Sequence, residues 1–309
     1  MTKKYQVGVI LMTYGSPKTL DDIPAYLKNV YGGKDASAEV IAEFRRRYNI
    51  IGGSPLVKIT QNQAAALERE LHKQATDTKF QVAAGMRFSD PFIESVTKKL
   101  TCGSDMIVGI IMSPQYSPII MSGYRKELER AVTKLNRGDL GLKIAKAWHL
   151  QPHFIQALAQ KVQQQLNNLP KNVLVLFSAH SMPKRVIDKE PDYIDQLKET
   201  AAATAKAVRL PKDRWTFCYQ SAGHTPEEWL KPDFADIMPK LQKKGHTHVL
   251  IAPVQFLADH LEILYDIDIA AREQAEKHGI QFSRTTSLND SPLFIKALAT
   301  IVKETVNKD

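Results

Sequence analysis

The sequence predicts an α/β, doubly wound fold, and three observations lead to that prediction. Most apolar runs are continuous in Val, Ile and Leu, which is typical of strands buried on both faces of a parallel sheet. Segments with apolar residues three and four positions apart lie between these runs and indicate amphipathic helices. The resulting repetition of strand, loop and helix is typical of open α/β sheets.

The expected elements cover the chain from end to end. Strands are expected at residues 7–12, 81–86, 106–113, 142–148, 172–178, 216–221, 248–256 and 281–286. The clearest helices are expected at 54–74, 117–136, 192–208 and 291–306. A polar residue followed by proline is a good helix start, because the missing proline N–H would have no partner there. Such pairs are Ser54–Pro55, Asp90–Pro91, Ser117–Pro118 and Ser291–Pro292.

The chain is expected to form two domains, at 1–150 and 151–309. Its 309 residues are close to the upper limit for one hydrophobic core. The two halves also resemble each other weakly, because 9–17 and 173–183 share an apolar strand followed by Ser and Pro. The last helix, at about 291–307, either stays with the second domain or packs back on the first.

Composition excludes several classes of protein. No apolar run reaches the roughly 18 residues of a membrane-spanning helix, and the N-terminal run is interpreted as a strand, not as a signal peptide. The two cysteines, Cys102 and Cys218, indicate a reducing cytosol and are too few for an iron–sulfur cluster, which needs about four. The net charge of +9 suits a substrate rich in carboxylates. The sequence has no basic tail, RNA-binding signature or zinc-finger spacing, which argues against nucleic acid.

Candidate functional residues follow the ends of predicted strands, where open α/β sheets bind their ligands. They are Tyr14, Gln115, His180 and the group at 259–262. His180 has small neighbours, Ser178, Ala179 and Ser181, which leave room for a ligand beside the imidazole. The alternative is a histidine that is merely satisfied in the core.

The stretch "LADHLEILYD" at 257–266 has two interpretations. Asp259 and Glu262 have the spacing of a capping box at a helix start. Alternatively, Asp259, Glu262 and Asp266 share one face of a continuing helix and bind a metal together with an imidazole. Both interpretations stay open from the spacing alone.

Two loops are also candidates for binding. Residues 52–55, Gly-Gly-Ser-Pro, lead into a helix, and their backbone N–H groups could meet an anion. Neither GxGxxG nor GxxxxGK[ST] spacing occurs, which argues against a nucleotide enzyme. The polar, Trp-bearing segment 219–232 is expected to form a lid or a substrate wall.

Three segments together resemble the ferrochelatase family: "LFSAHSMP", "YQSAGHTPEEWLKP" and "PVQFLADHLEILYDID". The segments "RYNIIGGSPL", "PQYS" and "SLNDSPLFIKAL" extend the resemblance over essentially the whole chain. The resemblance implies two Rossmann-like domains, each with a parallel sheet flanked by helices, and a porphyrin cleft between them. It also implies insertion of Fe²⁺ into a porphyrin during haem biosynthesis.

The resemblance also implies roles for single residues. The metal-handling histidine and its partner glutamate fall on His180 and Glu262. The axial ligand of the product iron in the short Gram-positive type falls on Tyr14. Porphyrin contacts fall on Arg47, Tyr48, Ser54 and Tyr124.

The chain departs from patterns known in the family at several places. Tyr31 stands at or near the position of an arginine that binds a propionate there. Ala270 stands where some members carry a glutamate for a second metal. The stretches "GMRFSDPF" and "PQYS" are more similar to members that act on protoporphyrin IX.

The resemblance and the residues together predict a cytoplasmic, monomeric ferrochelatase acting on coproporphyrin III or protoporphyrin IX. Fe²⁺ is its substrate, and neither a tightly bound cofactor nor an iron–sulfur cluster is expected. His180 either accepts a porphyrin proton or delivers the iron. The expected partners include a protein that transiently accepts haem. The alternatives are a chelatase for another metal or tetrapyrrole, and a non-catalytic haem-binding protein that uses Tyr14 as ligand.

Overall fold

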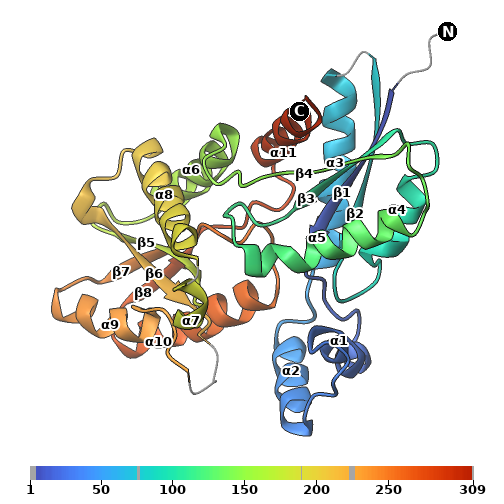
Figure 1. Ribbon diagram of the computed structural model, residues 1–309. Coiled ribbons are helices and arrows are strands. Elements are labelled where there is room, and N and C mark those ends of the chain that lie inside the picture. The colour runs from blue at the N-terminus through green and yellow to red at the C-terminus, as the bar shows by residue number, and fades with distance from the viewer. Residues whose placement is uncertain (1–4, 75–76, 189, 223–226, 308–309) are drawn as a thin grey trace. The chain divides into compact units, whose positions relative to one another are not determined.

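The computed structural model describes residues 5–74, 77–188, 190–222 and 227–307 (Figure 1). The chain forms two compact units. Unit 1 comprises Met1–Met112, Pro118–Trp148 and Asn289–Asp309. Unit 2 comprises Ser113–Ser117 and His149–Leu288. Within the described ranges, no helix combines the length and the apolar character that crossing a membrane requires.

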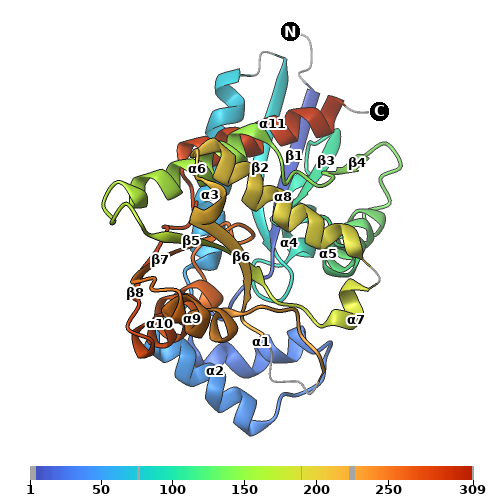
Figure 2. The same cartoon turned by 90° about the vertical axis from the view of Figure 1, so that its left-hand side faces the viewer.

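Unit 1 is built on a four-stranded parallel sheet in the order β2-β1-β3-β4. Its strands are β1 (Tyr5–Thr13), β2 (Thr78–Met86), β3 (Met106–Ile111) and β4 (Gly141–Ile144). Figure 2 shows them side by side in this order. The inner strand β1 is buried from Val7 to Thr13, which explains why its sequence is continuously apolar and does not alternate.

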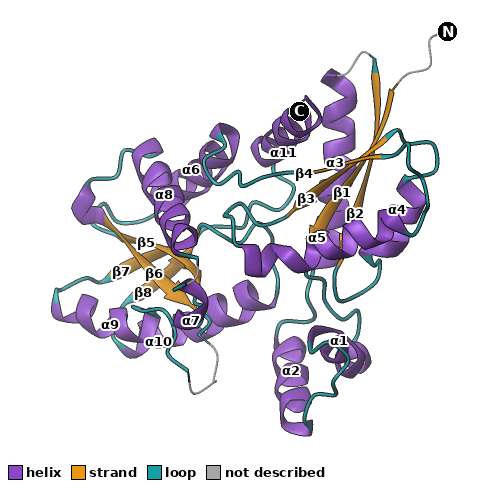
Figure 3. Ribbon diagram, viewed as in Figure 1, coloured by secondary structure: helices purple, strands orange, loops and turns teal. Residues whose placement is uncertain are grey.

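Helices cover both faces of this sheet (Figure 3). One face packs against α4 (Ile93–Leu100) and α5 (Pro118–Thr133), whose apolar side chains join those of β1 and β3 in one core. The other face carries α3 (Leu56–Gln74) and α11 (Pro292–Asn307), which contact each other and the sheet. The C-terminal helix thus completes the core of the unit that contains the N-terminal strand.

Two further helices follow β1 and contact each other: α1 (Ile23–Val30) and α2 (Ala38–Ile50). A 3-10 turn at Leu20–Asp22 leads into α1. Tyr26 of α1 donates from its hydroxyl to the Gly15 carbonyl at 3.2 Å, and Asn29 donates to the Phe88 carbonyl at 3.1 Å. These bonds tie α1 to the loops that follow β1 and β2.

Unit 2 repeats the architecture with a parallel sheet in the order β6-β5-β7-β8. Its strands are β5 (Leu174–His180), β6 (Trp215–Gln220), β7 (His248–Pro253) and β8 (Gln281–Arg284). The same relative order occurs in unit 1, in agreement with the weak repeat seen in the sequence. One face carries α6 (Pro152–Leu166) and α8 (Pro191–Ala207), which contact each other, and the short α7 spans Lys184–Ile187.

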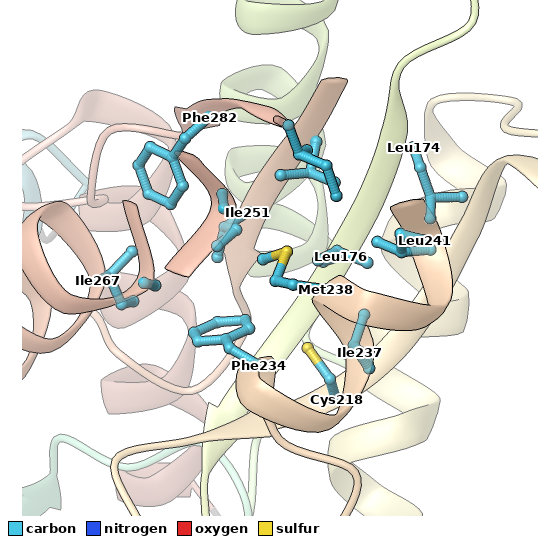
Figure 4. Close-up of a cluster of buried hydrophobic side chains, with 14 of the residues drawn as sticks. Leu174, Leu176, Cys218, Phe234, Ile237, Met238, Leu241, Ile251, Ile267 and Phe282 are labelled. Atoms are coloured by element: carbon cyan, nitrogen blue, oxygen red, sulfur yellow. The ribbon is translucent and has the colours of Figure 1, made fainter. Parts of the chain in front are cut away.

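The other face of the second sheet packs against α9 (Phe234–Lys243), a π-helix at Glu262–Ala271 and α10 (Arg272–Lys277). Figure 4 shows how the buried side chains of this layer meet. Met238 of α9 lies beside Leu176 and Ile251 of the inner strands, and Ile267 approaches from the π-helix. This core fixes the π-helix against the strands whose carboxyl ends carry the candidate site.

The prediction of two α/β units with parallel sheets is confirmed, and one predicted helix start is wrong. Asp90 does not cap a helix, because α4 begins at Ile93 and its N-cap residue is Phe92. The Asp90–Pro91 peptide bond is cis, and Met86 donates its N–H to the Pro91 carbonyl at 2.8 Å. The pair therefore lies in a turn that leads from β2 to α4.

The segment Ser113–Ser117 belongs to unit 2, although the chain on both sides of it belongs to unit 1. Gln115 is fully buried and donates to Thr200 Oγ1 at 3.1 Å and to the Val254 carbonyl at 3.4 Å. Ser117 donates to Glu190 Oε2 at 2.5 Å. Gln115 is thus a packing residue of unit 2, not the ligand-facing residue that its position after a strand predicted.

Candidate active site

The imidazole of His180 lies at the carboxyl end of β5, and its backbone is held by a chain of polar contacts. The His180 N–H donates to Gln255 Oε1 at 2.9 Å, and Gln255 Nε2 donates to Tyr193 Oη at 2.5 Å. Tyr193 is fully buried, and this burial raises the pKa of its phenol. The chain of contacts fixes the strand end while the imidazole itself stays partly exposed.

A second imidazole faces the same carboxylate as His180. His180 Nε2 lies 3.6 Å from Glu262 Oε1, and His260 Nε2 lies 3.6 Å from Glu262 Oε2. The Nδ1 atoms are hydrogen-bonded to backbone carbonyls, of Ser181 for His180 and of Ala258 for His260. Since a carbonyl only accepts, each Nδ1 carries a proton. In the neutral imidazoles both Nε2 lone pairs then point at the carboxylate.

Glu262 stays ionised in this arrangement. Burial by itself raises the pKa of its carboxyl, but attraction to His180 and His260 in their protonated form, together with a hydrogen bond from His260, outweighs burial and lowers the pKa to about 2. The ring of Phe256 meets both imidazoles edge-on, with centroid distances of 6.3 Å to His180 and 4.6 Å to His260. The site therefore combines a charged carboxylate and two nitrogen lone pairs beside an apolar wall.

Glu262 is the first residue of the π-helix, and this start overturns the capping interpretation of Asp259. The N-cap residue is Leu261, which makes no side-chain cap bond. Asp259 instead accepts a bond from Ser287 Oγ at 2.7 Å and lies 3.5 Å from Arg284 Nη1. It lies outside the helix, so Asp259, Glu262 and Asp266 do not form one helical stripe.

The alternative interpretation, a metal held by three aligned carboxylates, is also not found. Among the described residues, no group of three or more His, Cys, Asp or Glu side chains is gathered closely enough to hold a metal ion. The groups that do come together around Glu262 are the two imidazoles. His260 belongs to the candidate group at 259–262, but the sequence did not predict that it shares the Glu262 carboxylate with His180.

In unit 1, the loops after β1 and β2 bring Tyr14 beside Arg87 and Phe88. The backbone hydrogen bonds between β1 and β2 continue past the ends of these strands. Arg87 donates its N–H to the Thr13 carbonyl at 2.9 Å, and Phe88 donates its N–H to the Tyr14 carbonyl at 3.0 Å. The Tyr14 ring meets the Phe88 ring edge-on at 4.5 Å and is 44% exposed. Tyr14 is thus packed on one side and accessible on the other.

Tyr124 of α5 lies near the same group. Its ring is buried, and burial followed by the proximity of Tyr14 raises its pKa. The Arg87 guanidinium lies over the Tyr124 ring at 5.4 Å and over the Phe88 ring at 4.7 Å. Arg87 Nε also lies 3.4 Å from Glu127 Oε1, whose carboxyl has a pKa raised mainly by burial. Arg87 was missed by the sequence, although it follows the end of β2 directly.

Arg47, Tyr48 and Ser54 lie on α2 and the loop after it. Arg47 donates to Glu43 Oε1 at 2.7 Å, and bonds from Arg46 and then Arg47 lower the pKa of Glu43 to about 2. Tyr48 is buried and stacks on Phe44 with a centroid distance of 6.4 Å. Ser54 Oγ accepts from the Leu56 N–H at 3.4 Å at the start of α3.

The glycine loop at 52–55 does not offer the anion site that the sequence suggested. The N–H groups of Gly52 and Gly53 donate to the carbonyls of Asn49 and Tyr48, at 3.2 and 2.9 Å, and close the end of α2. Both glycines have positive φ, 70° and 94°. Of the predicted lid at 219–232, residues 223–226 lie outside the described residues.

The sequence of this chain is similar to that of known proteins along almost its whole length. The family model described as Ferrochelatase matches residues 6–306. A protein named ferrochelatase from Herpetosiphon aurantiacus is 37% identical over 303 residues, which cover 96% of this chain and 98% of that protein. A protein named coproporphyrin III ferrochelatase from Halalkalibacterium halodurans is 35% identical and covers 98% of both chains.

The fold of this chain is also similar to that of solved structures. The Bacillus subtilis protein SirB, solved with Fe³⁺, superimposes with a TM-score of 0.61 over 98% of this chain and 96% of its own. Only 12% of the residues are identical, so this likeness supports the architecture alone. The sequence matches cover a similar share of the chain at 37% and 35% identity.

Proposed function

This chain belongs to the ferrochelatase family, and on that premise we propose that it inserts Fe²⁺ into a free-base porphyrin in haem biosynthesis. One observation carries the assignment to residues: Nε2 atoms of two imidazoles face the two oxygens of the Glu262 carboxylate, each at 3.6 Å. Lone pairs and a negative charge that face each other in this way favour a proton or a metal cation between them.

The reaction requires such groups, because a porphyrin loses two N–H protons when it takes up a divalent metal. His180 Nε2 is free to accept one of these protons, since its Nδ1 is held by a backbone carbonyl. Glu262 carries negative charge and can stabilise the imidazolium that forms, or the incoming cation. The same groups suit Fe²⁺, so His180 is proposed either to accept a proton or to deliver the metal, with Glu262 as its charged partner.

The porphyrin contacts are proposed to come from unit 1. Tyr14 is the proposed axial ligand of the product iron, supported by the exposure of its ring next to Phe88. Arg47, Tyr48, Ser54 and Tyr124 are the proposed porphyrin contacts. Arg47 is supported by its positive charge, which suits a substrate that carries carboxylates.

Iron is proposed to be the substrate of the protein rather than a resident cofactor. We also propose that the chain acts as a monomer in the cytoplasm, with a transient haem-accepting protein as a partner. Its two cysteines, exposed Cys102 and buried Cys218, are both free thiols, which suits a reducing compartment.

Anaerobic turnover with Fe²⁺ and a free-base porphyrin tests the proposed function. The wild-type protein should convert the free-base visible spectrum to the metallated one catalytically, with coproporphyrin III, with protoporphyrin IX or with both. A non-catalytic haem-binding protein would bind added haem without turnover. A chelatase for another metal would turn over Co²⁺ but not Fe²⁺. Either of these two results would contradict the proposal.

The His180→Ala variant tests the assignment of the site. It should lower turnover at least about a hundredfold, because a positioned proton acceptor or metal donor is lost. His278→Ala is the matched control, since His278 is a partly buried histidine of the same unit whose imidazole contacts Gln242 of α9. A folded His180→Ala protein that keeps most of its activity would remove His180 from the mechanism.

A further inference from the structure

One arginine, at the end of β8, holds both ends of the segment that carries His260 and Glu262. Arg284 donates from Nε and Nη2 to the two oxygens of Asp268, at 2.7 and 2.8 Å. Its Nη1 donates to the Thr285 carbonyl at 2.9 Å and lies 3.5 Å from Asp259 Oδ1. Asp259 directly precedes His260, and Asp268 lies within the π-helix that begins at Glu262.

This network is largely protected from solvent. The Arg284 side chain is 13% exposed, and those of Asp259 and Asp268 are 22% and 27% exposed. Ser287 donates to Asp259 and orients its carboxylate. Only a guanidinium can grip one carboxylate with two parallel bonds and still reach a second carboxylate, because an ammonium group is a single point charge.

The π-helix needs such support from outside. This type of helix is rare, and in proteins it is concentrated at functional sites. Leu261 offers no side-chain cap at its start. A slip of the backbone by one residue would turn the Glu262 carboxylate away from both imidazoles. The bidentate bond to Asp268 and the contact to Asp259 oppose that slip from both sides.

We propose that Arg284 is a positioning residue for the metal-handling groups, acting through Asp259 and Asp268 on His260 and Glu262. The proposal rests on the proposed function, because it assumes that Glu262 handles iron. It predicts a specific defect: loss of Arg284 weakens the use of Fe²⁺ and leaves the use of porphyrin unchanged. A role in stability alone would lower the melting temperature without separating the two substrates.

The test compares Arg284→Met and Arg284→Lys with wild type in steady-state turnover. We expect KM for Fe²⁺ to rise about ten- to a hundredfold in Arg284→Met, as is typical when a residue that orients a metal-handling group is lost. KM for the porphyrin should stay within about twofold of the wild-type value, because the proposed role of Arg284 concerns only the use of Fe²⁺. Arg284→Lys should be intermediate, because it keeps the charge and loses the bidentate bond.

The matched control is Arg214→Met in the same unit. Arg214 donates from Nε and Nη2 to the Val173 carbonyl, at 3.1 and 2.8 Å, just before β5 begins and thus at the other end of the sheet. It should lower the melting temperature and leave both KM values unchanged. If Arg284→Met does not fold, the same two KM values are measured for Asp268→Asn instead. This substitution keeps the size of the side chain and removes its charge.

Folded variants of Arg284 or Asp268 whose KM for Fe²⁺ equals that of wild type would overturn the proposal. An equal rise in KM for Fe²⁺ in Arg214→Met would overturn it as well. Glu262→Gln, assayed beside them, separates this failure from failure of the proposed function. If Glu262→Gln is inactive while the Arg284 variants are normal, only the positioning role is wrong. If Glu262→Gln is fully active, the iron-handling role of Glu262 is wrong.

Discussion

An alanine at position 123 would place its methyl group 2.0 Å from the guanidinium carbon and from Nη2 of Arg87. No non-bonded atoms approach so closely, so one of the two groups must move. The guanidinium is the end of a flexible side chain, whereas Gly123 is fixed within α5. Arg87 should therefore swing away and lose its ion pair with Glu127 and its positions over the rings of Tyr124 and Phe88.

Opposing effects decide the sign of the change in stability. Replacing glycine with alanine inside a helix stabilises by about 1 kcal/mol. Against this, a partly exposed ion pair contributes about 0.5 kcal/mol, and each cation–π contact about 0.5 to 1 kcal/mol. The losses total about 2 kcal/mol, so Gly123→Ala should destabilise the protein by about 1 kcal/mol.

The same substitution should have the opposite sign when Arg87 is already absent. In an Arg87→Met background the clash and the three contacts are gone, and only the helix gain of about 1 kcal/mol remains. Melting of the four proteins by far-UV circular dichroism measures this, with about 2 °C expected for each kcal/mol in a chain of this size. An equal shift caused by alanine in both backgrounds would refute the packing of Arg87 against Gly123.

Three further predictions concern the candidate site. Glu262→Gln should abolish most turnover at a small cost in melting temperature, because Glu262 makes no cap bond; a large thermal loss with normal turnover would contradict this. Tyr14→Phe should keep porphyrin binding but alter the visible spectrum of the bound ferric product, and identical spectra would exclude Tyr14 as a ligand. The pKa of Glu262 lies below its ordinary value of 4.5, at about 2, so its carboxylate stabilises the fold above pH 4.5 and this stabilisation is lost as pH falls towards 2. The contribution should be about 1 kcal/mol after allowance for solvent, because the side chain is 36% exposed. Urea unfolding of wild type and Glu262→Gln should therefore differ at pH 7 and converge near pH 2, whereas a pH-independent difference would contradict the coupling.

Much of the fold could be predicted from local sequence. The inner strands β1 and β5 are continuous apolar runs because helices cover both of their faces. The Ser-Pro pairs before α5 and α11 mark true helix starts. Asp90–Pro91 has the same pattern but lies in a turn, because local residues do not encode the bridge between Met86 and Phe92 that bends the chain there.

The site was predictable at strand ends and unpredictable where distant segments meet. His180 could be identified because it ends a buried strand. The role of Asp259 could not, because its partners Arg284 and Ser287 come from a later strand and loop. The α-helical spacing of Asp259, Glu262 and Asp266 was misleading, since the helix starts only at Glu262 and has the wider turn of a π-helix.

The chain passes between its two compact units at four places: after Met112, Ser117, Trp148 and Leu288. If the gene were divided after the codon for Trp148, the two products, residues 1–148 and 149–309, would therefore not correspond to the two compact units. The first product would carry buried Gln115 without Thr200 and Val254, and it would lack α11. The second would lack the Ser117 hydroxyl that donates to Glu190. The two units must therefore be made as one polypeptide, because unit 2 includes residues 113–117 from the first half of the chain and unit 1 lacks α11 until the last residues have been made.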